Sequence, residues 1–132
     1  MFKLIKILNS GVNVAEPMLF KKDKASVFAI GTPVKLEGGK LVNVDATTAP
    51  THIITEEGAS GESVYAHEIT SDMIFETVVT EDPSALSVGD AVTLEIENGA
   101  AIAVSATTEG GSAKIYDLAG AREIGDSVYV RF

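Results

Sequence analysis

Two histidines and several pairs of carboxylates are the side chains of this chain that could do chemistry. His52 and His67 each lie in a stretch with β-strand character, and a metal site would need a third ligand at strand spacing. Glu68 does not supply that ligand for His67, because neighbouring residues of a strand point to opposite faces. We therefore expect both histidines to be surface or interface imidazoles, and we predict no metal site.

Paired carboxylates can act as the acid and base of glycoside hydrolysis. Asp72 with Glu76, and Glu95 with Glu97, form such pairs, but they occupy outward strand positions in a chain with 19 acidic residues, where chance pairs are expected. No serine lies in a G-x-S-x-G motif, and neither a GxGxxG nor a GxxxxGK[ST] phosphate loop occurs. We predict no catalytic residue, no cofactor and no enzyme activity.

Charge and composition restrict the partners. The formal net charge of −9 and the isoelectric point of about 4.6 repel phosphate backbones, so nucleic acid is not an expected partner. The chain has no cysteine, which excludes disulfides and thiolate metal sites. Lys3 and Lys6 interrupt the short apolar run at the start, and no small-residue cleavage pattern follows. We therefore predict neither a signal peptide nor a membrane span.

The elements that would position these side chains are strands. The chain of 132 residues has the length of one domain, and Val, Ile and Thr account for 36 residues, a weighting that favours sheet. The clearest element is residues 89–104, where Val92, Leu94 and Ile96 alternate with polar residues. This period of two predicts a β-hairpin with one buried face.

The turn of this hairpin sets its register, because a slip of one residue moves every side chain to the other face. A two-residue loop would leave Ile102 and Val104 on the wet face. A three-residue loop, 97–99, whose glycine takes the left-handed conformation, instead places these two residues opposite Leu94 and Val92. We predict the three-residue loop.

The start of this hairpin recurs in the chain. A Gly-x-x-Val-x-(Leu/Val) sequence begins at Gly31, Gly89 and Gly125, and residues 31–44 repeat the hairpin pattern of 89–104. The last copy ends the chain, with Val128, Val130 and Phe132 predicted to point inward. The repeat indicates either a duplicated barrel unit or a turn-and-strand pattern that small β-proteins use repeatedly.

Further strands are predicted at 51–55, 63–69, 73–80 and 113–117. The strand 73–80 is apolar on both faces, which indicates a central strand or one covered by a neighbouring subunit. Asp82 and Pro83 predict at most one helical turn, with Asp82 as its N-cap and Pro83 at the first helical position.

These elements predict an all-β fold, a small β-barrel or β-sandwich of antiparallel hairpins with an extended N-terminal arm and at most one short helical turn. Residues 1–24 form the N-terminal arm or an edge strand, and residues 25–132 form a single β-domain. Lys21, Lys22 and Lys24 form a basic cluster, which is either a solvated loop or a contact with an acidic neighbouring surface.

The run IFETVVTEDPSALSVGDAVTL at 74–94, followed by AKIYDL at 113–118 and GDSVYVRF at 125–132, resembles the capsid decoration (cement) proteins encoded in tailed-phage and prophage head gene clusters. The likeness covers roughly residues 27–132 and rests on the pattern of strands and turns. It implies a non-enzymatic virion structural protein that binds copies of itself, for example as a trimer, and the major capsid protein. It places the protein in the bacterial cytoplasm during assembly and then in the virion.

Two other functions remain open. A tail-tube or head-completion protein would share these sequence features. The alternative from another class is a β-barrel module that binds a carbohydrate or another small molecule, for which Tyr65, Tyr116 and Tyr129 would form a stacking platform.

Overall fold

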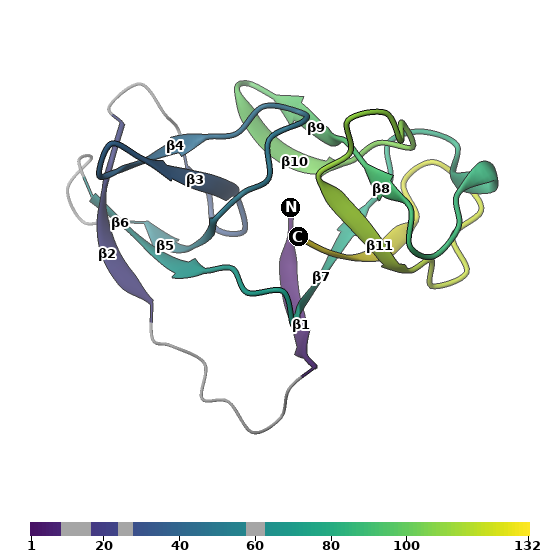
Figure 1. Cartoon of the computed structure of the whole chain (residues 1–132), viewed down its shortest axis with the longest axis horizontal. Coiled ribbons are helices and arrows are strands. Elements are labelled where there is room, and N and C mark those ends of the chain that lie inside the picture. Colours follow the sequence, from purple (N-terminus) through teal and green to yellow (C-terminus); the bar gives the residue numbers. More distant parts are fainter. Residues whose placement is uncertain (9–16, 24–27, 58–62) are drawn as a thin grey trace.

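The computed structural model describes residues 1–8, 17–23, 28–57 and 63–132, and these form an all-β fold with one 3-10 turn, as the sequence predicts (Figure 1). The elements are β1 (Lys3–Ile7), β2 (Met18–Lys22), β3 (Pro33–Glu37), β4 (Lys40–Asn43), β5 (His52–Glu57), β6 (Ser63–Glu68), β7 (Met73–Val78), η1 (Pro83–Ala85), β8 (Ala91–Val92), β9 (Leu94–Glu97), β10 (Ala100–Val104), β11 (Ala113–Asp117) and β12 (Ser127–Arg131).

A closed barrel makes up one side of the molecule, on the left in Figure 1. Its strand order is β2-β4-β3-β5-β6, and all its pairs are antiparallel except β2 with β4, which run parallel. Buried apolar side chains fill its interior: Phe28, Val34, Leu41, Ile54, Val64 and Ala66. Closure leaves no free edge among these five strands.

A five-stranded sheet, in the order β1-β7-β12-β11-β8, makes up the other side. β7 lies inside it between β1 and β12, and its residues Met73, Ile74 and Phe75 are fully buried. This confirms the central strand predicted at 73–80. β12 lies between β7 and β11, with Val128 and Val130 buried as predicted, so the end of the described chain is part of the sheet.

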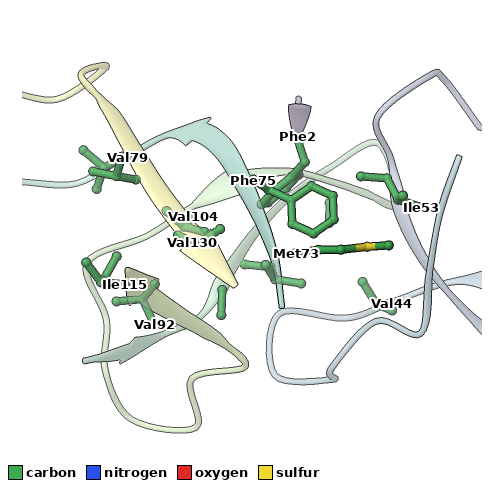
Figure 2. Packing of buried hydrophobic residues seen from close by; sticks show 14 of the residues in the cluster. Phe2, Val44, Ile53, Met73, Phe75, Val79, Val92, Val104, Ile115 and Val130 are labelled. Carbon is green, nitrogen blue, oxygen red and sulfur yellow. The ribbon is translucent and has the colours of Figure 1, made fainter. Parts of the chain in front are cut away.

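One core joins the two sides. Figure 2 shows Phe2, Met73 and Phe75 of the sheet side facing Ile53 and Val44 of the barrel side. The ring of Phe132 packs against this core, with its centroid 5.6 Å from that of Phe75 and 5.7 Å from that of Phe2. The barrel is therefore held to the sheet by apolar packing.

The hairpin β9-β10 forms a two-stranded sheet of its own between the barrel and the larger sheet (Figure 1). Its turn contains two residues, Asn98 and Gly99, with φ of 52° and 81°, and Ala100 lies opposite Glu97. Positive φ at both central residues is the type I′ conformation, whose twist matches that of the strands. The predicted three-residue loop is therefore wrong.

A β-bulge in β10 brings Val104 to the buried face of the hairpin. It lies between Ala101 and Ala103 and adds one residue to β10. Val104 is therefore opposite Leu94, and both are buried, whereas Ile102 is only half-buried. The burial predicted for Val104 is confirmed, whereas Ile102, predicted opposite Leu94, lies in the bulge. The extra residue is in the strand and not in the turn.

The beginning of the predicted hairpin also differs. Val92 belongs to β8 and lies opposite Ala113 of β11, not opposite Val104. Thr93, predicted on the wet face, is buried, and its hydroxyl lies 2.7 Å from that of Ser105. The chain therefore passes from one sheet to another at Thr93. Since β3-β4 is in the barrel and β9-β10 is not, the two hairpins are not equivalent units of one barrel.

The segment 1–24 contributes two strands. β1 is the edge strand of the larger sheet and pairs antiparallel with β7, with a bulge between Leu4 and Lys6. β2 is part of the barrel, and Lys21 and Lys22 of the basic cluster lie at its end. Lys24, the third lysine of that cluster, and residues 9–16 lie outside the described residues.

The predicted helical turn is confirmed as η1. Asp82 is its N-cap, and its carboxylate accepts a hydrogen bond of 2.9 Å from the Ser84 amide. Pro83 lies at the start of the turn, where no amide hydrogen is needed. This hydrogen bond holds the pKa of Asp82 below its usual value.

Candidate functional site

The two histidines lie on neighbouring strands but point to opposite faces of the barrel wall. In the register of β5 and β6, His52 lies opposite Glu68, and His67 lies opposite Ile53. His52 is buried, so the expectation of a surface or interface imidazole is wrong for this residue. His67 is half-buried and lies on the outer face.

His52 has the environment of a core residue. Its ring meets the ring of Phe20 edge to face, with centroids 4.8 Å apart, and Nδ1 lies 2.8 Å from the Thr51 hydroxyl. Burial lowers the pKa of His52 below the usual 6.5, and the negative charge of Glu68 partly offsets this. The imidazole is therefore neutral at physiological pH.

Asp72 and Glu76 have separate surroundings in the structure. Asp72 precedes β7 and accepts a hydrogen bond from the Thr70 hydroxyl, while Glu76 lies within β7 opposite Lys3 of β1 and Tyr129 of β12. Within the described ranges, no three His, Asp or Glu side chains are grouped closely enough to hold a metal ion.

The three tyrosines do not form one platform. Tyr65 lies on β6 of the barrel opposite Leu19, whereas Tyr116 and Tyr129 lie on the neighbouring strands β11 and β12 of the larger sheet. Tyr116 occupies a bulge of β11, and both sheet tyrosines are half-buried. Of the three residues proposed for carbohydrate stacking, Tyr116 and Tyr129 therefore lie on neighbouring strands, and Tyr65 lies apart from them on the barrel.

The most distinctive feature of the described surface is a set of three turns, each with an exposed β-branched aliphatic residue before its glycine. Each of the three glycines of the Gly-x-x-Val repeat is the third residue of a four-residue turn that leads into a strand. We name the turns after their second residue: the Ile30 turn (29–32), the Val88 turn (87–90) and the Ile124 turn (123–126).

The three turns have the same backbone hydrogen bonds. The amide of the fourth residue donates to the carbonyl of the first over 3.1, 3.1 and 3.2 Å, in chain order. The amide of the glycine donates over 2.8 Å to a carbonyl of a buried residue, Ile54, Ile115 or Val79. The glycine φ values are +84°, +95° and +94°, as the third position of a type II turn requires. Each turn is thus anchored to the core.

The second residue of each turn is a β-branched aliphatic that projects into solvent. The side chains of Ile30, Val88 and Ile124 are 62%, 65% and 67% exposed. In two of the turns an aspartate at the fourth position adds rigidity: Asp90 accepts from the Ser87 amide over 2.8 Å, and Asp126 accepts from the Glu123 amide over 3.0 Å. The turns therefore present apolar groups in a fixed geometry.

The glycines of this repeat were predicted from the sequence, but the aliphatic residue before each one was not. Ile-Gly, Val-Gly and Ile-Gly precede the three strands, and a β-branched residue just before a turn glycine was the available signal.

A groove of about 390 Å³ lies between the start of β1 and the barrel strands β5 and β6. Its lining is apolar except for Lys3, Thr55 and His67, and Ile30 is part of it. The Thr55 hydroxyl is buried without a hydrogen-bond partner. The residues that line the groove are Met1, Phe2, Lys3, Leu4, Ile30, Gly31, Ile53, Ile54, Thr55 and His67.

Charge is separated along the chain. Seven of the ten lysines and arginines lie in residues 1–40, whereas residues 41–113 contain 13 acidic residues and no lysine or arginine. The basic part includes β1, which borders the groove, and the acidic part includes η1 and the Val88 turn. The groove is lined by residues of both parts, with Lys3 from the first and Ile53, Thr55 and His67 from the second.

Comparisons with protein-family models, with curated proteins and with solved structures gave no match to this chain. In the described part of the chain, η1 is the single helical element, and no helix there is long and apolar enough to cross a membrane.

Proposed function

We propose that this chain is a structural protein of a tailed-phage or prophage virion, a decoration protein that binds copies of itself and the major capsid protein and so reinforces the shell. On this proposal the protein assembles in the bacterial cytoplasm and ends in the virion. The proposal extends the resemblance of residues 74–94, 113–118 and 125–132 to such proteins.

The observation that carries the proposal is the set of three rigid turns. Backbone hydrogen bonds to the core hold each turn so that its aliphatic side chain is exposed to water. Covering this side chain with a partner surface is favourable, because apolar area is removed from water. Because the turn is already ordered, binding costs little further conformational entropy. Three such contacts on one small β-body suit adhesion to several neighbours at once, where weak contacts add through multivalency.

The test is co-sedimentation with expanded, undecorated capsids. We expect the chain to pellet with capsids in a saturable manner and to stay in the supernatant without them. Ile124→Asp places a charge at one turn and should weaken this binding. Thr108→Asp adds the same charge at an exposed loop position outside the three turns and is the matched control. Failure of the wild-type chain to bind any such shell would contradict the proposal.

The groove favours a second candidate function, a β-barrel module that binds a small molecule. Ligand sites are mostly apolar, have a few polar groups and measure roughly 300–1,000 Å³, and the groove of about 390 Å³ fits this description. An NMR screen with a mixture of mono- and disaccharides and small carboxylic acids tests it. Shifts confined to Ile53, Thr55 and His67 would favour this function over decoration.

A further inference from the structure

The polar groups of the groove select for an acidic partner. Lys3 carries an ammonium, Thr55 has a buried hydroxyl with no partner, and His67 adds an imidazole, so all three can donate a hydrogen bond. None of the ten lining residues is acidic, although the chain holds 19 acidic residues. The complementary occupant has an exposed aliphatic side chain flanked by carboxylates.

Residues 81–90 of this same chain have that chemistry. They contain Glu81, Asp82 and Asp90 but no lysine or arginine, and Val88 projects from them. The segment is already ordered by η1 and by the hydrogen bonds of the Val88 turn. Little conformational entropy would therefore be lost when it binds.

The groove and this segment cannot meet within one molecule. In Figure 1, η1 is at the far right of the sheet side, whereas the N-terminus and the start of β1 are at the centre of the molecule. A contact between them needs two copies, and it joins two different surfaces. Such a contact is heterologous, and it forms a closed ring when the rotation between copies closes.

We propose that the groove binds residues 81–90 of a second copy, so that copies associate head to tail. This inference rests on the self-association part of the proposed function and names the two surfaces that make it. The Ile124 turn is outside the contact and stays available for the shell.

The test measures self-association by sedimentation velocity over a range of protein concentrations and salt. Wild-type protein should form oligomers that weaken between low and high salt, because opposite charges face each other. Ile30→Glu places a negative charge in the groove, and Val88→Arg places a positive charge in the acidic segment. Each should weaken association at least about tenfold. Ile124→Arg, at the equally exposed position of the third turn, should leave it unchanged.

Mixing the two variants gives the sharpest result. Ile30→Glu keeps an intact acidic segment and Val88→Arg keeps an intact groove, so the mixture should form a one-to-one heterodimer although neither variant associates alone. This heterodimer also shows that both variants are folded. No heterodimer, unchanged association of either variant, or a monomeric wild type at all concentrations would overturn the inference.

These outcomes are separate from those of the capsid experiment. A wild-type monomer that still pellets with capsids would overturn head-to-tail association and leave decoration standing. Head-to-tail oligomers that never bind a capsid would overturn decoration and leave head-to-tail association standing.

Discussion

Replacing the glycine of each turn by alanine tests two features of the three turns. The glycines share a positive φ, but the space available for a Cβ differs between them. All three glycines have φ between +84° and +95°, where a Cβ is strained. At Gly89 and Gly125 a Cβ would meet nothing within 4 Å. At Gly31 it would lie 2.5 Å from the carbonyl oxygen of Phe2, which is backbone and cannot rotate away.

The expected magnitudes follow from these distances. The positive φ alone costs about 1–2 kcal/mol, so Gly89→Ala and Gly125→Ala should destabilise the protein by that amount. Gly31→Ala adds overpacking of about 1–3 kcal/mol. It also disturbs the 3.1 Å hydrogen bond from the Phe2 amide to the Gly31 carbonyl, a bond of about 0.5–1.5 kcal/mol. The total for Gly31→Ala is about 2.5–6.5 kcal/mol.

Urea unfolding followed by circular dichroism measures all three variants against wild type. The midpoint of Gly31→Ala should fall clearly below those of the two controls, which should agree with each other. In thermal unfolding each kcal/mol lowers Tm by about 3–6 °C for a domain of this size. Equal destabilisation by all three substitutions would refute the close contact between Gly31 and the backbone of Phe2.

Three further predictions concern the core and its polar contacts. Phe75→Ala should destabilise the protein by about 3–5 kcal/mol, measured by urea unfolding, because its ring is fully buried; a loss below about 1 kcal/mol would contradict this packing. The folded-state pKa of His52 is lowered, so the unfolded state binds more protons below pH 6.5. The contribution of neutral His52 to the free energy of unfolding is therefore fully present above pH 6.5 and is lost as the pH falls through the lowered pKa. His52→Gln should remove this fall in stability below pH 6.5, measured by urea unfolding at a series of pH values, and an unchanged slope would argue against a neutral buried imidazole. Asp126→Ala should speed hydrogen exchange of the Arg122 and Glu123 amides, which donate to its carboxylate over 2.8 and 3.0 Å; unchanged exchange would show that this carboxylate does not hold the turn.

The strands were predictable because their local signals agreed with the final packing. The strand 113–117 and the buried alternation of Val128 and Val130 follow from a period of two that no tertiary contact overrides. The cap at Asp82 and Pro83 was predictable for a similar reason, since a capping hydrogen bond is local.

The register of the 89–104 hairpin was not predictable by the same means. Two devices can keep one face apolar, an extra residue in the turn or a bulge in the strand, and a period-two pattern does not separate them. The structure uses a type I′ turn at Asn98 and Gly99 with a bulge after Ala101. The sequence Asn-Gly is itself the strongest local signal for a two-residue turn, and the structure follows it.

The candidate sites depended on contacts between distant segments. The burial of His52 comes from Phe20 of β2, a strand whose place in the barrel no local pattern indicates. The groove forms where β1 meets β5 and β6, which are far from it in sequence. The three turns, by contrast, have a signal in the local sequence, which is the repeated glycine with an aliphatic residue before it.

Hydroxyl-radical footprinting with mass spectrometry tests the central claim most directly, which is that the three turns present aliphatic side chains for adhesion. It compares dilute free protein with protein bound to expanded capsids. We predict that Ile30, Val88 and Ile124 are oxidised in the free protein and protected on the capsid, while an exposed residue outside the turns, such as Leu36, keeps its reactivity. Unchanged oxidation of all three on the capsid would contradict the account.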